Sequence, residues 1–515
     1  MKYTLNTLII FIVLSCQIAW GQEKEIIDGI VHEATENSQL EKLAHELLDV
    51  IGPRLVGTPQ MHNAHNWAKD TYEDWGVQVR REQWGDWRGW ERGITHIDLI
   101  SPRIVSLEGR QLAWSPSTPD GGVTGEAVVI PKVDNPQEFE QWLSEVEGKF
   151  VLISMDQPTG RPDYNWEEFA TEESYQNMKN ERAAHRRLWS ERIANAGLNN
   201  ITLVEKLEEA EAAGIIISNW SKGFGTNKVF DAKTKTIPMI DLGLEDYGML
   251  FRMAENGVEP VISVTAESRE LGRVPAFNTI GEIRGTEKPD EYVVLSAHFD
   301  SWDGGTGATD NGTGTITMME VVRILQEIYP NPKRTILVGH WGSEEQGLNG
   351  SRAFVKDHLG IVDNIQVLFN QDSGTGRVVD ISGQGFVEAY DYLGTWLSAV
   401  PDEISDHITT TFPGLPGSGG SDHASFVTAG VPAFNLRSLD WDYRTYTWHT
   451  NRDTYDKIVF DDVRNNVILT AILAYMASED QETASRKKRV MPRHPVTGKP
   501  RAWPVTRDPN RNGGN

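Results

Sequence analysis

Short apolar runs and helical patterns alternate along the second half of the chain. Runs rich in β-branched and aromatic residues predict strands at 291–297, 335–341, 366–371 and 432–437. Apolar residues at helical spacing predict helices at 312–328, 350–359, 389–399 and 461–478. This alternation predicts an α/β fold with a mostly parallel central sheet flanked by helices.

The first half of the chain has a different organisation. Its start predicts helices at 23–48 and 62–75, joined by a Gly- and Pro-containing loop, and then a strand at 77–84. A composition shift follows near Ala113. The next stretch predicts several short strands and one long charged helix at 166–192.

These shifts predict how the chain divides into domains. We expect a main domain built from residues 22–110 and 271–480. We expect an inserted domain, the insert, at 111–270, because that block supplies none of the chemistry described below. Residues 481–515, the tail, are basic, proline-containing and poor in apolar residues, so we expect the tail to be disordered or loosely attached.

Residues that bind metals recur where the predicted strands of the main domain end. In open α/β sheets, ligands gather outside the carboxyl ends of the strands. Imidazole and carboxylate groups are the ligands to expect at a hydrolytic zinc site. A single acid in such a loop is usually only solvated, but here the residues recur after successive strands, as His298 with Asp300 and Asp310, Glu344 with Glu345, Asp372, and His449 with Asp453. The recurrence predicts a metal site at this edge of the sheet.

Composition and charge narrow the class of function. With 39% hydrophobic and 24% charged residues, the chain has the composition of an ordinary soluble globular protein. Its formal net charge of −25 argues against a nucleic-acid partner.

The first residues have the pattern of an export signal at 1–21. Lys2 supplies the positive start, an apolar run follows, and Ala19 to Gly21 form a small-residue cleavage site. The run is too short to span a bilayer as a mature helix, so we expect no stable membrane span. Cys16 is the only cysteine of the sequence. We favour simple cleavage and an exported chain over lipid anchoring through Cys16.

Several motifs together resemble a known family. AHFDS and GATDNGTG, GSEEQGLNGS, NQDSG, GSDHASF and HTNRDT resemble the co-catalytic zinc aminopeptidases and carboxypeptidases of the M28 peptidase family. Within it, the IGPRLVGTP loop and the insert resemble the branch typified by plasma glutamate carboxypeptidase, or carboxypeptidase Q. The insert, with GKFVLIS, AAGIIISN and IPMIDL, resembles a protease-associated domain. The resemblance implies a phosphorylase/hydrolase-like fold.

The resemblance also implies a role for each candidate residue. It implies two zinc ions, one held by His298 and Asp372, the other by Glu345 and His449, with Asp310 bridging them. It implies that Glu344 is the general base. A bridging carboxylate offsets the repulsion between two nearby cations, and the ions polarise the carbonyl and acidify water. Adjacent acids point in different directions, so one can bind metal while its neighbour transfers a proton.

Supporting residues are expected around this set. Asp300 and Asp453 are close in sequence to two of the histidines, so we expect their carboxylates to hold the imidazole tautomers. Many relatives carry Tyr before the last His, where this chain has Trp448. The donor to the tetrahedral oxyanion therefore stays open, with Tyr443, Tyr446 and His423 as alternatives to Trp448. For His423, a place in the pocket and a structural hydrogen bond are equally weighted.

The predicted function is an exported di-zinc exopeptidase that acts on short peptides. Aminopeptidase or dipeptidase action comes first, because acids outnumber bases near the motifs and an acid would bind a substrate ammonium. A carboxypeptidase acting on dipeptides is the nearest alternative. A glutaminyl-cyclase-like enzyme with one zinc and a receptor-like member without a metal site are the others, and the intact ligand set argues against both. We expect the insert to cap the cleft, and we leave a homodimer open.

Overall fold

The central sheet of the main domain consists of four neighbouring parallel strands. They are β9 (Lys288–His298), β10 (Arg334–Trp341), β11 (Ile365–Gln371) and β14 (Ala433–Ser438), in the order β14-β11-β9-β10. Antiparallel strands flank them: β8 (Val261–Ile283) next to β10, and β12 (Val378–Ser382) next to β14, followed by β13 (Thr409–Thr411). The predicted fold class is confirmed: it is an α/β fold with a large, mostly parallel sheet.

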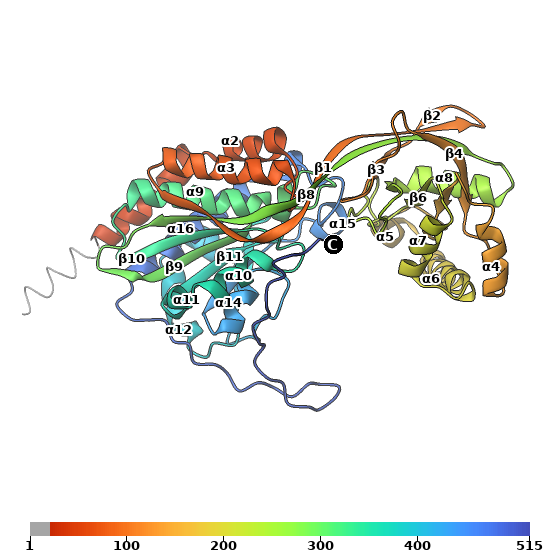
Figure 1. Ribbon diagram of the computed structural model, residues 1–515. Helices are drawn as coiled ribbons and strands as arrows, with labels where there is room; N and C mark the ends of the chain where they lie inside the picture. Colours follow the sequence, from red (N-terminus) through yellow and green to blue (C-terminus); the bar gives the residue numbers. More distant parts are fainter. Residues whose placement is uncertain (1–20, 515) are drawn as a thin grey trace, which may run out of the picture.

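The computed structural model describes residues 21–514 of the chain (Figure 1). The expected export signal and Cys16 lie outside this range, apart from Gly21. In the described range, every helix is too short or too polar to cross a membrane.

Both faces of the sheet are buried under helices, which explains the continuous apolar runs of its strands. Along β9, Val293 and Leu295 contribute to one core, and Tyr292 and Val294 contribute to the core on the opposite face. The first face is covered by α2 (Leu40–Ala44), α3 (Pro59–Asp74), α9 (Thr313–Ile328) and α16 (Phe460–Glu479). The second is covered by α10 (Asn349–Asp357), α11 (Leu359–Asp363) and α14 (His423–Ala429) (Figure 1).

Shorter elements complete the main domain. They are η1 (His45–Ile51), η2 (Ala308–Gly312), α12 (Ala389–Leu397), α13 (Asp402–Ser405), α15 (Tyr443–Tyr446) and η3 (Tyr455–Lys457). Helix α3 starts earlier than residue 62, where the pattern predicts it. Thr58 caps the helix by accepting a hydrogen bond from the Met61 amide at 3.2 Å, and Pro59 supplies a preset first turn.

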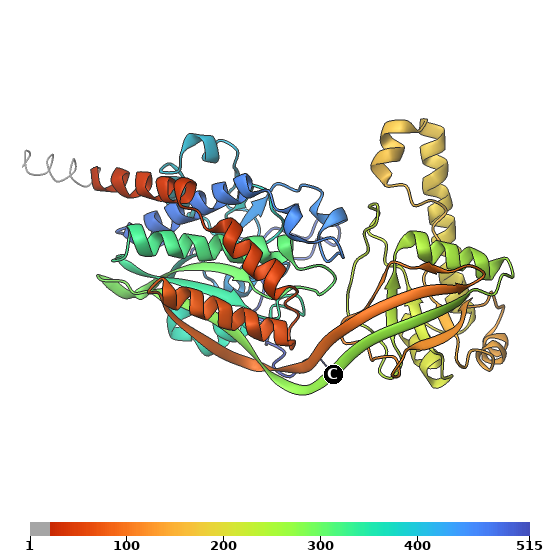
Figure 2. The ribbon, with the colours of Figure 1, turned by 90° about the horizontal axis from the view of Figure 1, so that it is seen from above.

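A long antiparallel ribbon joins the main domain to the insert. It consists of β1 (Gln78–Ser101) and β8, which pair along almost their whole length. Figure 2 shows the ribbon bending between the two lobes. The sequence pattern predicts only short strands here, at 77–84 and 261–265, because the glycines of the ribbon resemble turn residues. In the structure they lie at irregularities of the pairing: the register shifts beside Gly85 and Gly89, and Gly89 pairs with Gly272.

The insert has its own cores, and its strands continue the central sheet through the pairing of β4 (Val123–Val129) with β8. Four parallel strands, β4, β5 (Phe150–Leu152), β6 (Gly214–Ile217) and β7 (Met239–Leu242), are followed by antiparallel β3 (Gly109–Gln111), while β2 (Val105–Ser106) pairs with β1. Its helices are α4 (Pro136–Leu143), α5 (Asp163–Phe169), α6 (Glu172–Asn195), α7 (Asn200–Glu209) and α8 (Leu244–Glu255). The last residues of β1 pair inside this lobe, so the lobe begins earlier than the expected residue 111. The single helix expected at 166–192 is two helices, because Thr171 caps the second by accepting from the Ser174 amide.

The tail, which its composition predicts to be disordered or loosely attached, contacts the main domain. Although it contains no regular helix or strand over its described part, it makes specific contacts along the main domain. The Trp503 indole donates to the Val427 carbonyl at 3.0 Å, and the Arg511 guanidinium donates to the Trp84 carbonyl at 2.7 Å. A few aromatic and arginine side chains therefore hold the tail against the main domain. The low apolar content of the tail did not indicate these contacts.

Candidate metal and catalytic site

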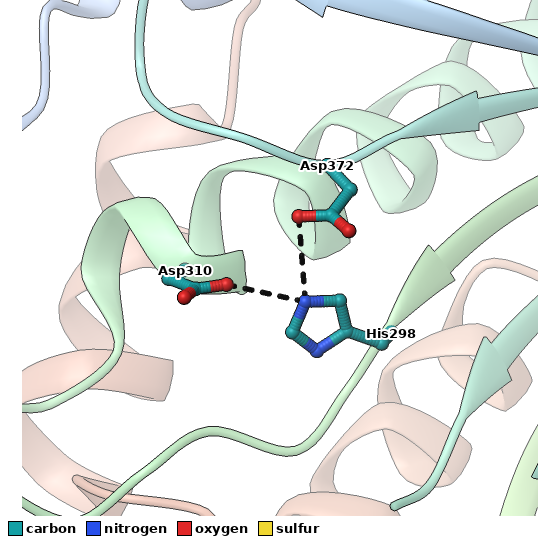
Figure 3. Close-up of side chains that lie close together, drawn as sticks. All are labelled: His298, Asp310 and Asp372. Carbon is teal, nitrogen blue, oxygen red and sulfur yellow. Dashed lines mark ion pairs between the residues drawn. The ribbon is translucent and has the colours of Figure 1, made fainter. Parts of the chain in front are cut away.

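The first group of candidate metal-binding residues lies at the carboxyl ends of β9 and β11. His298 ends β9, Asp372 follows β11, and Asp310 lies in η2, in the loop after β9. The His298 Nε2 atom lies 3.3 Å from Asp310 Oδ1 and 3.5 Å from Asp372 Oδ1 (Figure 3). All three side chains are buried or nearly so. Residues that are far apart in the sequence thus meet at the carboxyl ends of the parallel strands, as predicted from the sequence.

The second group shares Asp310 with the first. The His449 Nε2 atom lies 3.2 Å from Asp310 Oδ2 and 2.9 Å from Glu345 Oε2. Asp310 thus turns one carboxylate oxygen toward each group. Among the described residues, these two sets are the ones whose ligand atoms are close enough together to hold an ion.

The two groups fit divalent metal ions. Two ligands of a tetrahedral zinc ion, each about 2.1 Å from it, lie roughly 3.4 Å apart, which matches these separations. Within residues 21–514, His298 Nε2, Asp310 Oδ2 and Glu345 Oε1 are buried polar atoms without a hydrogen-bond partner. Buried polar atoms normally have partners, and an ion in each group would satisfy these three.

Charge coupling inside the groups is strong. Burial lowers the pKa of His449, but the Glu345 and Asp310 carboxylates raise it to about 10. Burial raises the pKa of Asp310, but the His298 and His449 imidazoles bring it well below its usual value. The pKa of Glu345 is raised to about 7, first by burial and then by the charge of Asp310. Carboxylates this close together repel one another unless positive charge lies between them. Protonated histidines or bound metal ions can supply that charge.

Asp300 and Asp453 hold the ligand loops rather than the imidazole rings. The Asp300 carboxylate accepts the backbone amides of Glu344 at 2.9 Å and Glu345 at 3.2 Å. The Asp453 carboxylate accepts the amides of Thr309 at 2.8 Å and Asp310 at 3.0 Å. We expected contacts to the neighbouring histidines, but closeness in sequence does not determine where a side chain points.

The imidazole of His298 is held by a backbone group instead. Its Nδ1 atom lies 2.9 Å from the backbone carbonyl of Asp300, and the Asp300 carboxylate is 3.8 Å away. A donor contact from Nδ1 to that carbonyl leaves Nε2 free to face the metal group.

Arg54 is a supporting residue that the sequence analysis missed. It is fully buried, and its guanidinium donates to the carbonyls of Phe299 at 2.8 Å, Thr306 at 2.8 Å and Gly307 at 2.9 Å. These carbonyls belong to the loop that carries Asp310. Burial lowers the pKa of Arg54 to about 10, while nearby acids, with Asp453 first, oppose that shift. The sequence marks Arg54 only as a member of the IGPRLVGTP loop, and its supporting role could not be predicted because its partners are backbone atoms.

Glu344 lines the same cavity as both metal groups. The cavity has a volume of about 430 Å³, and its lining includes Asp310, Glu345, Asp372 and His449. Burial raises the pKa of Glu344 well above its usual value; His298 opposes this, and the charge of Asp372 adds to it. A carboxylate with a raised pKa, free of the metal groups, can accept and return a proton.

The insert reaches the loop that carries His449. The Val229 amide donates to the His449 carbonyl at 2.8 Å, and the Phe230 ring packs edge-on against the His449 ring at 5.3 Å. The Lys228 ammonium donates to the Trp448 carbonyl at 2.9 Å and lies 4.1 Å from the centre of the Trp448 ring. That ring stacks on the His449 imidazole, with 4.1 Å between the two ring centres. The insert therefore reaches the strand ends and contacts one candidate metal ligand, His449.

The four candidates for the oxyanion donor are placed differently. Tyr443 and Trp448 line the cavity. Tyr446 lines a neighbouring cavity, and burial together with the Tyr164 hydroxyl of the insert raises its pKa to about 12. His423 is buried in the first turn of α14, outside the cavity lining, and burial lowers its pKa to about 4.

Known proteins share both the sequence pattern and the fold. Residues 278–474 match the family model of peptidase family M28. Carboxypeptidase Q of Mus musculus is 28% identical over 476 residues, and that of Homo sapiens is 27% identical over 467 residues; each alignment covers 90% of this chain and 90% of the relative.

Solved structures with low sequence identity show the same fold. A peptidase M28 precursor from Shewanella amazonensis SB2B superposes with a TM-score of 0.64 at 24% identity, covering 92% of this chain and 99% of that one. The zinc aminopeptidase BSAP from Bacillus subtilis superposes with a TM-score of 0.54 at 19% identity, covering 87% and 97%.

Proposed function

The chain carries a peptidase family M28 domain and is a metallo-exopeptidase, and from that premise we propose a two-metal enzyme, exported from the cell, that cleaves short peptides. The export proposal rests on the pattern of residues 1–21. The two-metal proposal rests on one observation: the Asp310 carboxylate is shared, with one oxygen toward each of the two ligand groups.

The ligand groups also assign the chemistry. His298 and Asp372 would hold one divalent ion, Glu345 and His449 the other, and Asp310 both. When bound, two such ions supply Lewis-acid polarisation of the scissile carbonyl and of water. Zinc suits this set of imidazole and carboxylate ligands.

Proton transfer falls to Glu344. In the proposed reaction its carboxylate takes a proton from the attacking water and delivers it to the amine that leaves. Asp300 supports this step because it accepts the backbone amides of both Glu344 and Glu345, which keeps one acid in the metal group and its neighbour free.

Tyr443 is the best-placed donor to the developing oxyanion. It lines the cavity beside both metal groups, and burial raises the pKa of its hydroxyl, with the charge of Asp310 adding to the shift, so the phenol stays protonated. The Trp448 ring stacks on the His449 ring, and the Lys228 ammonium lies over it. These contacts suit a residue that positions His449 better than one that donates a hydrogen bond to the oxyanion.

The alternatives are less well supported. A single-zinc cyclase would not need a second ligand group around the same carboxylate, and a receptor-like member would not need either group. The insert is proposed as a protease-associated-like lid, supported by its contacts with the His449 loop.

Hydrolysis of free and blocked peptides tests this function. The purified chain should release amino acids from unblocked di- and tripeptides and leave peptides blocked at both ends intact. A chelator should abolish the release, and added zinc should restore it. Cleavage inside doubly blocked peptides, or turnover that survives the chelator, would contradict the proposal.

A further inference from the structure

Three arginines line the cavity that contains both metal groups. Arg352 comes from the first turns of α10, Arg444 from α15, and Arg507 from the tail. Among the described residues, none of the three forms an ion pair with a carboxylate. A concave site therefore contains guanidinium charge that the protein itself leaves unpaired.

The position of Arg507 follows from how the tail is anchored. The residues just after it bind α10: Asp508 pairs with Lys356, the Asn510 amide donates to Asn349 Oδ1 at 2.8 Å, and Arg511 pairs with Asp357 at 2.7 Å. These contacts fasten the tail along the helix that carries Arg352. Arg507 is thereby held at the cavity while its own side chain stays exposed.

Arg352 and Arg507 are close enough to influence each other. Burial lowers the pKa of the half-buried Arg352, and the charge of Arg507 lowers it further. Two like charges at the rim of one cavity repel, and an anion bound between them would remove that repulsion. The planar fork of a guanidinium matches a carboxylate in two-point contacts better than other side chains do.

Among the described residues, the acids near these arginines form no ion pair with them, although the charges of Asp422 and Glu344 partly oppose the lowering of the Arg352 pKa. Asp310, Glu345 and Asp372 belong to the metal groups, and Glu344 is the proposed base. Arg444 has a different neighbour, since its guanidinium lies 5.7 Å from the centre of the Trp448 ring. Among the described residues, Arg352 and Arg507 are thus the two arginines of the cavity lining with neither an ion pair nor an aromatic ring contact.

We propose that Arg352 and Arg507 form a subsite for a carboxylate of the peptide substrate, with Arg507 supplied by the C-terminal tail. The inference rests on the proposed exopeptidase function and names its substrate class: peptides with a negative charge close to the scissile bond. The charge is either the free C-terminal carboxylate of a short peptide or an acidic side chain. The tail is then part of the substrate site.

Kinetics on paired substrates test the subsite and separate its two sources. Ala-Leu is compared with Ala-Leu amide for the terminal carboxylate, and Ala-Glu amide with Ala-Gln amide for the side chain. Loss of a charge-assisted contact should lower kcat/KM about 10- to 100-fold. Arg352→Gln and Arg507→Gln should show this loss on the charged member of the preferred pair and little change on its neutral partner.

Two further variants control the experiment. Arg507→Lys should recover part of the loss, because the charge remains while the fork geometry is gone. Arg493→Gln changes another tail arginine, whose described side-chain contact is the nearby Gly498 carbonyl, and should match the wild type. Equal loss on charged and neutral substrates, or no loss in either subsite variant, would overturn the proposal.

A binding measurement tests the subsite without turnover. In the Glu344→Gln background, calorimetry should find that the charged member of one pair binds about tenfold or more tightly than its neutral partner. Arg507→Gln in the same background should reduce that ratio. Equal affinities in both pairs would contradict the subsite. A charge-dependent affinity together with no hydrolysis of any peptide by the wild type would contradict the proposed function and leave the subsite standing.

Discussion

The cavity lining contains an acidic and a basic set of side chains, here called the acidic wall and the basic wall, which come from different kinds of structural element. The acidic wall consists of Asp310, Glu344, Glu345 and Asp372, which come from loops at the ends of strands. The basic wall consists of Arg352, Arg444 and Arg507, which come from two helices and the tail. We propose that the acidic wall serves the chemistry and that the basic wall selects the substrate.

The two walls also differ in how firmly they are held. Asp300 accepts two backbone amides of the loop that carries Glu344 and Glu345. Asp453 accepts two amides, and Arg54 donates to three carbonyls, of the loop that carries Asp310. Among the described residues, the arginine side chains of the basic wall have no comparable support. Catalytic groups need fixed geometry, whereas long cations at a rim can adapt to different peptides.

The largest expected effect separates two neighbours within the acidic wall. Glu344→Gln removes the proposed base but no metal ligand, so kcat should fall about 10² to 10⁴-fold while KM changes little. Glu345→Gln is the same chemical change one residue later, but it should weaken one metal group, because a neutral amide is a poorer zinc ligand than a carboxylate.

Zinc rescue distinguishes these two roles. Added zinc should partly restore Glu345→Gln and leave Glu344→Gln inactive. Rescue of Glu344→Gln instead would mean that the two roles are reversed, and full activity of both variants would place the active site elsewhere.

The next effect concerns the support of the acidic wall. Arg54→Met leaves several buried carbonyls without donors, at about 1 to 3 kcal/mol for each group left unsatisfied. Thermal or urea unfolding of the metal-free protein should show the loss, and zinc affinity should fall with it. Arg80→Met, which removes an exposed arginine paired with Glu82, should change stability by less than about 1 kcal/mol. Equal stability of the two variants would show that the Arg54 contacts are dispensable.

A smaller effect tests whether the insert contributes to the site. Lys228→Met removes a cation from the face of Trp448 and a donor to two carbonyls of the His449 loop. A cation on an aromatic face is worth roughly 0.5 to 2 kcal/mol, so zinc affinity and kcat/KM should fall about 3- to 30-fold. Lys222→Met, in an exposed pair with Asp163, is the matched control within the insert. Identical behaviour of both variants would leave the insert without a role at His449.

The smallest expected effect is a salt dependence that distinguishes the walls. Exposed charges are screened when the ionic strength rises, while buried ones are screened much less. Raising salt from about 0.05 to 0.5 M should therefore raise KM for carboxylate-bearing peptides by a few-fold and hardly change kcat. Salt that lowers kcat and leaves KM constant would point to the acidic wall instead.

The acidic wall could be predicted from the sequence, and the basic wall could not. Asp310, Glu345 and Asp372 follow predicted strands, and the edge of a parallel sheet brings such loops together. Arg352 and Arg507 carry no comparable signal, because one lies on a helix and the other in a coil whose composition resembles disorder. Acids outnumber bases near the motifs, but Asp310, Glu345 and Asp372 belong to the candidate metal groups.

Other differences between expectation and structure have the same kind of cause. The long ribbon of β1 and β8 was predicted only in part, because Gly85 and Gly89 resemble turn residues in the sequence and lie at irregularities of strand pairing in the structure. The directions of Asp300 and Asp453 could not be predicted, since their partners are backbone amides of loops that are distant in the sequence.

The central claim is that Asp310 joins two metal sites, and the metal content of the protein tests it most directly. Elemental analysis of the chain, purified without chelator and supplemented with zinc, should find close to two divalent ions per chain, since each of the two ligand groups fits one ion. A stoichiometry near one after zinc supplementation would contradict the two-metal account.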